Sequence, residues 1–236
     1  AAVVSVALGL FSFSLPKTPP KATNESPSIR EILGLDALKL LNDSRYLIFF
    51  ISSILICIPL AFYYQDANLF LNELGMKNAA GVMTLGQISE ALFILLLPIF
   101  LNKYGIKKTL IVGMFAWSLR YVLFAFGDTG SNIWMLIFGI VLHGICYDFF
   151  FVSGQIYTDF KAGEKYKSAA QGLIALATYG LGMLIGFRLA GRVTDQFALD
   201  PGHDWTQIWI IPAIFAAVVL VIFILTFKNE KIEIEK

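Results

Sequence analysis

The sequence contains few charged residues, few cysteines and no concentration of basic residues. Charged residues make up 15% of the chain, against about 25% in soluble domains. The two cysteines, Cys57 and Cys146, lie in apolar runs, so neither a disulfide framework nor a metal site is expected. The 18 Lys and Arg residues form no basic stripe, which argues against a nucleic-acid partner. These shortages exclude an ordinary soluble domain and a disulfide-bonded scaffold.

Apolar residues are what the chain has in excess. They make up 57% of the sequence, with 21 Phe and a mean hydropathy of +0.72. Six apolar runs of 20–26 residues are each long enough to cross a hydrocarbon core of about 30 Å as a helix. They lie at 46–66, 80–101, 107–126, 132–157, 167–190 and 206–227. The sequence therefore predicts an all-α membrane protein whose transmembrane bundle has six helices and whose solvent is the lipid bilayer.

The remaining segments predict the domain organisation around this bundle, residues 46–227. Residues 1–15 are apolar but shorter than the roughly 20 residues that a span needs. We interpret them as the end of a helix that begins outside this chain, which is then a C-terminal fragment. Residues 16–45 predict a Pro-rich linker followed by a short amphipathic helix from 28 onward, and residues 228–236 predict a tail.

The basic residues predict the orientation of the bundle. Most of them fall in the linker 16–45, in alternate connections of the bundle and in the tail. Loops rich in Lys and Arg remain on the cytoplasmic side of a membrane. Both ends of the chain are therefore expected to be cytoplasmic, in a cell inner membrane, with the linker and the tail on the same side.

Away from the ends of the apolar runs, the charged residues are Glu90, Arg120 and Asp148. A charge at membrane depth is costly unless it is paired, protonated or hydrated, so such residues usually mark a transport path. For Asp148 the structural alternative is a hydrogen-bond acceptor that holds adjacent helices together. Arg120 lies six residues before the end of its run. We expect it to be a structural charge that reaches outward to Asp128 or Glu73.

Spacing predicts where the polar side chains meet. Gln87 and Glu90 are three residues apart and share one helix face, as do His143 and Tyr147, which are four apart. At about 1.5 Å per residue from the outer helix ends, Glu90 and His143 lie at one level, roughly 15–17 Å deep. Asp148 lies about 7 Å further toward the cytoplasm by the same rise. A carboxylate beside an amide suits a sugar hydroxyl or a base edge, and a tyrosine stacks on a base while keeping a hydrogen bond.

Several motifs carry a family resemblance. The connection at 98–108, with Gly105 between basic residues, resembles the short loop motif of the major facilitator superfamily. The segments 87–95, 116–128 and 144–154, followed by 169–172, resemble the nucleoside:proton symporters of that superfamily in order and spacing. This resemblance implies the C-terminal half of a major facilitator fold, helices 7–12, working with an N-terminal six-helix half that this chain lacks.

The resemblance also implies a function and a set of site residues. It implies proton-coupled import of nucleosides by alternating access, with no cofactor and no enzymatic activity. The implied substrate-binding positions are Gln87, Glu90, His143, Tyr147 and Tyr64, and the proton-coupling positions are Asp148 and Glu90. His143 replaces a residue that is an aromatic in the family, and Tyr64 falls where the family has an amide. Proton coupling requires a group whose pKa changes with burial and neighbouring charge.

Other functions remain open from the residues alone. A proton-coupled transporter of the same fold for sugars or oligosaccharides would place polar groups at the same depth. A membrane binding module that does not transport is a second alternative. An intramembrane enzyme using Asp148, His143 and Glu90 is a third, although the sequence contains no HExxH pattern and no Gly-x-Ser-x-Gly elbow.

Overall fold

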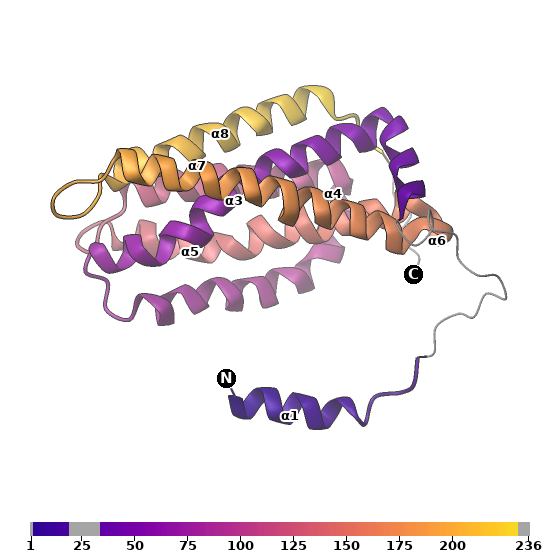
Figure 1. Ribbon diagram of the computed structural model, residues 1–236, viewed down its shortest axis with the longest axis horizontal. Helices are drawn as coiled ribbons and strands as arrows, with labels where there is room; N and C mark the ends of the chain where they lie inside the picture. Colours follow the sequence, from indigo (N-terminus) through magenta and orange to yellow (C-terminus); the bar gives the residue numbers. More distant parts are fainter. Residues whose placement is uncertain (1, 19–33, 231–236) are drawn as a thin grey trace.

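The computed structural model describes residues 2–18 and 34–230, and this part of the chain is almost entirely helical (Figure 1). The Pro-rich stretch and the start of the amphipathic segment, at 19–33, lie outside the described residues, as does most of the tail, at 231–236. The helices in chain order are α1 (Ala2–Ser12), the 3-10 helix η1 (Leu35–Asn42), α3 (Ser44–Glu73), α4 (Ala79–Phe126), α5 (Ile133–Cys146), the π-helix η2 (Tyr147–Val152), α6 (Ser153–Ala175), the π-helix η3 (Leu176–Gly182), α7 (Met183–Gln196) and α8 (Trp205–Thr226).

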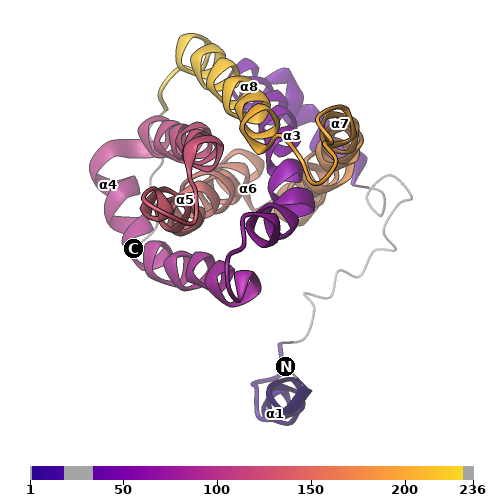
Figure 2. The ribbon, with the colours of Figure 1, turned by 90° about the vertical axis from the view of Figure 1, so that its left-hand side faces the viewer.

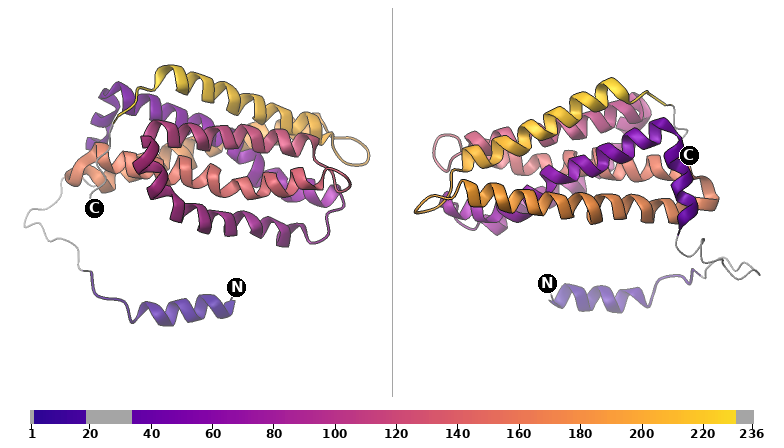
Figure 3. Two further views of the ribbon diagram at one scale, coloured as in Figure 1. Left: turned by 180° about the vertical axis from the view of Figure 1, so that it is seen from behind. Right: turned by 45° about the horizontal axis from the view of Figure 1, so that its top comes forward.

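Two glycines turn long helical stretches back on themselves. Helix α4 has 48 residues, which at 1.5 Å per residue would be about 72 Å long, more than twice the thickness of a hydrocarbon core. It reverses at Gly105, whose φ is 75°, and the stretch from α5 to α7 reverses at Gly163, whose φ is 61°. A positive φ is accessible to glycine at little cost. Figure 3 shows α4 folding back, so the predicted six-helix bundle and the tight turn at Gly105 are confirmed.

Within residues 2–18 and 34–230, four continuous helical stretches are long and apolar enough to cross a membrane, and the two glycine reversals divide them into six passes. Their ends meet at two opposite ends of the bundle (Figure 1). The reversals at Gly105 and Gly163 lie at the same end of the bundle as η1 and the end of α8. We call it the lysine-rich end, because the two reversals carry Lys103, Lys107, Lys108, Lys161, Lys165 and Lys167. The loops after α3, α4 and α7 lie at the other end.

Small residues allow the helices to approach closely where they cross. In the end-on view of Figure 2, α7 lies beside α3. A Cβ on Gly182 would lie 2.7 Å from Cys57 Cβ, and one on Gly186 would lie 2.6 Å from Ala61 Cβ. Gly182 and Gly186 therefore allow this span to pack closely against α3. Helix α4 packs most extensively on α5 and α8.

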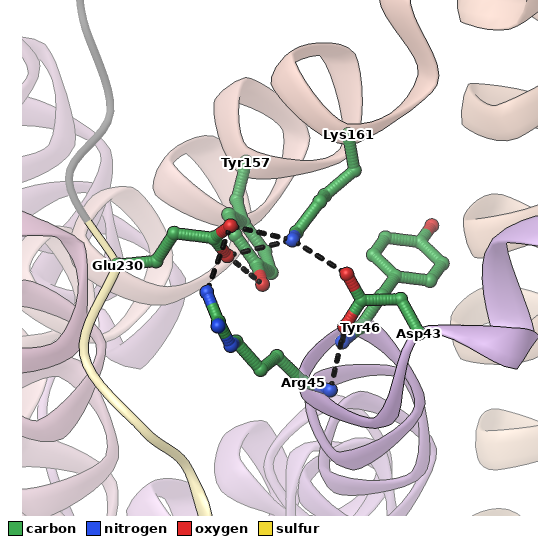
Figure 4. Close-up of polar contacts among 6 residues, drawn as sticks. All are labelled: Asp43, Arg45, Tyr46, Tyr157, Lys161 and Glu230. Atoms are coloured by element: carbon green, nitrogen blue, oxygen red, sulfur yellow. Dashed lines mark hydrogen bonds and ion pairs between the residues drawn. The ribbon is translucent and has the colours of Figure 1, made fainter.

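A network of ion pairs ties the lysine-rich end together (Figure 4). Lys161 Nζ lies 2.8 Å from Asp43 Oδ2 and 2.7 Å from Glu230 Oε2. Glu230 also accepts a 3.0 Å hydrogen bond from Tyr157 Oη and pairs with Arg45 at 3.1 Å. The network therefore joins the start of α3, the middle of α6 and the segment after α8.

At the same end, two charged side chains form hydrogen bonds with the backbone at helix ends. Asp43 caps α3 by accepting hydrogen bonds from the backbone N–H groups of Arg45 and Tyr46. The hydrogen bond from Lys161, together with these backbone donors, holds the pKa of Asp43 below its usual value. Lys107 Nζ donates a 2.9 Å hydrogen bond to the Ile224 carbonyl in the last turn of α8, so a base of the 98–108 connection stabilises a neighbouring helix end.

Candidate functional site

The crossing of α4 and α5 builds the site. Gly144 of α5 lies so close to α4 that an added Cβ would be 2.6 Å from the Glu90 backbone nitrogen. Its N–H donates a 3.0 Å hydrogen bond to Ser89 Oγ, which in turn donates to the Gly86 carbonyl at 2.7 Å. Because the backbones touch at this point, the residues beside Ser89 and Gly144 are brought together. Those residues are Glu90 and His143.

A line of three polar side chains runs from the bundle interior to its surface. Arg120 Nη1 lies 3.1 Å from His143 Nδ1, and His143 Nε2 lies 3.6 Å from Glu90 Oε2. Arg120 is 0% exposed and His143 is 3% exposed, whereas the Glu90 side chain is 35% exposed. The predicted common level of Glu90 and His143 is therefore confirmed, and Glu90 is the member of the line that a solute can reach.

Aromatic rings enclose this line. The guanidinium of Arg120 lies 3.4 Å from the centroid of the Tyr63 ring, a cation–π contact. The His143 ring stacks between those of Tyr63 and Tyr147, with centroid distances of 5.5 Å and 6.0 Å. The rings exclude water from the Arg120–His143 contact, which strengthens it.

Hydroxyl and amide groups form an accessible rim beside Glu90. Tyr147 Oη lies 3.0 Å from Tyr179 Oη, which joins η2 to η3. Tyr64 is 50% exposed and lies close enough to interact electrostatically with Glu90 and Tyr147. Gln87 is also exposed, one helical turn before Glu90. The rim offers a carboxylate, an amide and three phenols, which together can accept and donate hydrogen bonds to a polar ligand and stack on a flat one.

Asp148 lies behind the rim at the start of the π-helix η2. It is 0% exposed, and neither carboxylate oxygen has a hydrogen-bond partner among the described residues. It interacts electrostatically with Glu90. An acceptor that held helices together would show a donor from a neighbouring helix, so the structural alternative for Asp148 finds no support. π-Helical turns of this kind are frequent at functional sites.

Comparison with known proteins identifies the family. The model of the family described as nucleoside H+ symporters matches residues 1–232. The chain belongs to this family. It is 45% identical to the putative nucleoside transporter YegT of Escherichia coli over 98% of the chain, and 32% identical to the nucleoside permease NupG of the same bacterium over 99%. The chain spans 56% and 58% of the lengths of these two relatives, which is about half.

Solved structures support the same assignment. The crystal structure of a mutant of the nucleoside transporter NupG superposes with a TM-score of 0.82 over 96% of this chain and 59% of that one, at 32% identity. The crystal structure of NupG itself gives 0.76 over 97% and 59%. The bundle therefore has the fold of the C-terminal half of a major facilitator transporter, and the chain is a multi-pass membrane protein.

One expectation for this member of the symporter family is wrong. Arg120 does not reach outward to Asp128 or Glu73, because it is fully buried and contacts His143. These two carboxylates have other partners. Asp128 accepts from the backbone of Gly130 and from Asn132, and Glu73 accepts from Trp205 Nε1 and contacts the His203 ring. The long arginine stem points inward, where its charge lies over an aromatic ring.

Sequence reasoning also missed three residues of the site. Tyr63 lies against both Arg120 and His143, Tyr179 contacts the Tyr147 hydroxyl, and Ser89 accepts a hydrogen bond from the α5 backbone. Tyr63 and Tyr179 had a usable signal, because each is a polar aromatic inside an apolar run. Ser89 had one as well, since it lies between Gln87 and Glu90.

Proposed function

We propose that this chain supplies the C-terminal half of a secondary transporter that imports nucleosides together with protons by alternating access. The observation that carries the proposal is Glu90. It is a partly exposed carboxylate within a membrane pass, beside a buried Arg120–His143 contact and next to accessible phenols. Membership in the nucleoside H+ symporter family points to the same function. The protein is on this reading a transporter rather than an enzyme.

The rim suits a nucleoside because a nucleoside presents hydroxyl donors and a flat base. An ionised carboxylate only accepts hydrogen bonds, so Glu90 requires a donor from its ligand, such as a sugar hydroxyl. Gln87, one turn away, both donates and accepts. Tyr64 and Tyr147 offer ring faces for a base and hydroxyls for its edge. These four residues are the proposed direct contacts with substrate.

Asp148 and Glu90 are the proposed proton-coupling residues. A buried carboxylate with no cation or donor beside it is far less costly to keep protonated than ionised. Asp148 is buried, and neither of its carboxylate oxygens has a hydrogen-bond partner among the described residues. When the two halves of the transporter move against each other and water reaches the π-helix, hydration stabilises the ionised carboxylate, so Asp148 can release its proton. The electrostatic interaction between Asp148 and Glu90 links that step to the substrate residue.

The placement in the membrane follows from the lysines. The lysine-rich end carries Lys103, Lys107 and Lys108 at one reversal and Lys161, Lys165 and Lys167 around the other. We assign this end to the cytoplasm of a bacterial cell and the protein to the inner membrane, with both ends of the chain inside. Residues 46–227 are then helices 7–12, residues 1–15 the end of helix 6, and the partner is the N-terminal half.

Uptake by the full-length protein in proteoliposomes tests the proposal. We expect nucleoside-dependent proton uptake, measured with an interior pH dye and with radiolabelled uridine and adenosine. Glu90→Gln should weaken nucleoside uptake at least tenfold, which is the effect of losing one hydrogen bond to a charged group, about 1.5 kcal/mol. Glu164→Gln is the matched control, because that side chain is 88% exposed in the Gly163 reversal, and it should transport normally.

The coupling assignment has its own refutation. The double variant Glu90→Gln with Asp148→Asn should show no nucleoside-driven proton flux. If its proton flux equals that of the unmodified protein, neither carboxylate carries the coupled proton. A disaccharide included in the substrate panel distinguishes the sugar-transporting alternative, since uptake of the disaccharide without uptake of either nucleoside contradicts the nucleoside proposal.

A further inference from the structure

The contact between Arg120 and His143 fixes where the histidine carries its proton. Arginine has five N–H donors and no acceptor. The 3.1 Å contact between Arg120 Nη1 and His143 Nδ1 is therefore a hydrogen bond only if Nδ1 is the acceptor. A neutral imidazole that accepts at Nδ1 carries its hydrogen on Nε2. The ring nitrogen that faces Glu90 is thus an N–H donor.

The surroundings of His143 keep it in this state. The charged groups that approach its ring are Arg120 on one side and Glu90 on the other. The Tyr63 and Tyr147 rings cover its faces, and only 3% of the residue is exposed. A second proton on His143 would have to displace the arginine hydrogen bond and place two cations together in a dry site, which is costly.

We propose that Arg120 and His143 are positioning residues that act on substrate through Glu90. Arg120 fixes the tautomer of His143, and His143 presents its Nε2–H to Glu90 Oε2, leaving the other carboxylate oxygen to accept a donor from the ligand. The proposal rests on the proposed function in that it takes Glu90 as a substrate contact.

The geometry allows this contact to close. The Nε2–Oε2 distance of 3.6 Å exceeds a hydrogen bond by a few tenths of an ångström. Glu90 is partly exposed, and rotation of its side chain shortens the distance without moving a helix. The backbones on either side cannot separate easily, because Gly144 lies against α4 and is hydrogen-bonded to Ser89. A ligand that engages Glu90 therefore meets a carboxylate of defined orientation.

Two substitutions of His143 separate positioning of Glu90 from mere satisfaction of Arg120. In His143→Gln the side-chain amide nitrogen takes the place of Nε2, so a donor still reaches Glu90. In His143→Asn the shorter amide offers an acceptor to Arg120 but no donor reaches Glu90. We expect nucleoside affinity of the full-length protein within about threefold of normal for the Gln variant and weakened about tenfold for the Asn variant. If Asn binds as well as Gln or better, the proposal is overturned.

Variants of Arg120 test whether it acts on substrate binding, because nucleoside affinity and melting temperature are measured separately. Arg120→Met replaces a buried cation, two of whose nitrogens have no hydrogen-bond partner in the described residues, by an apolar side chain that matches only the arginine stem. We expect its melting temperature to be kept while nucleoside affinity falls about tenfold. Arg120→Lys keeps a donor and should recover part of the affinity. Normal affinity in the Met variant would contradict a role for Arg120.

A spectroscopic measurement checks the tautomer directly. In full-length protein labelled with ¹⁵N-histidine, the signals that disappear in His143→Gln belong to His143. We expect these signals to show a protonated Nε2 and an unprotonated Nδ1. A protonated Nδ1 overturns the proposal even if nucleosides bind normally. If the unmodified protein binds none of the nucleosides while its His143 has the expected tautomer, the proposed function fails and the inferred tautomer is upheld.

Discussion

Removal of Lys161 tests the ion-pair network at the lysine-rich end (Figure 4). Lys161→Met keeps most of the apolar stem of the side chain and removes its ammonium group. In the unmodified protein the ammonium group lies between two carboxylates, at 2.7 Å from Glu230 and 2.8 Å from Asp43. The substitution therefore removes one partner of Glu230, which is nearly buried, and the cation that pairs with Asp43, which is more exposed.

The expected loss of stability follows from exposure and from the partners that remain. The side chains of Lys161 and Glu230 are 10% and 16% exposed, so solvent screens their pair weakly. Breaking a fully buried pair costs about 3–5 kcal/mol, but Glu230 keeps Arg45 and Tyr157, and we reduce this to about 1.5 kcal/mol. Asp43 is 42% exposed, and its pair adds about 0.5 kcal/mol. The total is about 2 kcal/mol, or a fall of about 4–8 °C in melting temperature.

The assay is the melting temperature of the detergent-solubilised full-length protein, followed by tryptophan fluorescence. Lys165→Met is the matched control, because Lys165 lies in the same hairpin, is exposed and lies over the neighbouring Tyr166 ring. Its melting temperature should change by less than about 1 °C. A double-mutant cycle of Lys161→Met with Glu230→Gln should give a coupling energy of about 1 kcal/mol.

Two results would refute this reasoning. One is a Lys161→Met protein that melts within about 1 °C of the Lys165→Met control. The other is a coupling energy near zero between Lys161 and Glu230, which would mean that the loss arises from something other than their pair. Either result would show that the segment after α8 is not held to α6 by this network.

Three further predictions concern packing, pH and buried charge, each measured by the same melting assay. Gly144→Ala should destabilise the protein by about 1–3 kcal/mol, since its Cβ would overlap the α4 backbone. Gly172→Ala is the control, because a Cβ there meets nothing within 4 Å, and it should be neutral or slightly stabilising. Equal effects of the two substitutions would contradict the close crossing of α4 and α5. Because the pKa of Asp43 is lowered in the folded state, its stabilisation is present above about pH 3.9 and is lost as the pH falls through the lower folded value. Asp43→Asn should therefore flatten the acid limb of the melting-temperature curve, and a curve parallel to that of the unmodified protein would exclude this linkage. Asp148→Asn should keep or raise the melting temperature, because neither carboxylate oxygen has a hydrogen-bond partner among the described residues. Asp66→Asn alters a buried carboxylate that accepts two hydrogen bonds, so it should cost about 1 kcal/mol of stability and lower the melting temperature; equal losses in the two variants would show that Asp148 is paired.

The fold class, the membrane passes and the turns between them are predicted from the amino-acid sequence alone. Hydropathy runs of membrane length admit one regular structure, because each backbone group must be satisfied within its own segment in lipid. Gly105 marks a reversal for a local reason, since its backbone conformation is one that glycine adopts readily. The common level of Glu90 and His143 also followed from counting residues along two helices, because the helical rise is constant.

Which polar side chains contact one another across helices follows only from the tertiary structure. Arg120 was expected to reach outward, and the rotation of its helix against α5 directs it to His143 instead. The burial of His143, the position of Tyr63 beneath the guanidinium and the pairing of Lys161 with Glu230 join residues far apart in the chain. Periodicity fixes the depth of a side chain along its helix, but only the packing of one helix on another fixes its azimuth and therefore its partner.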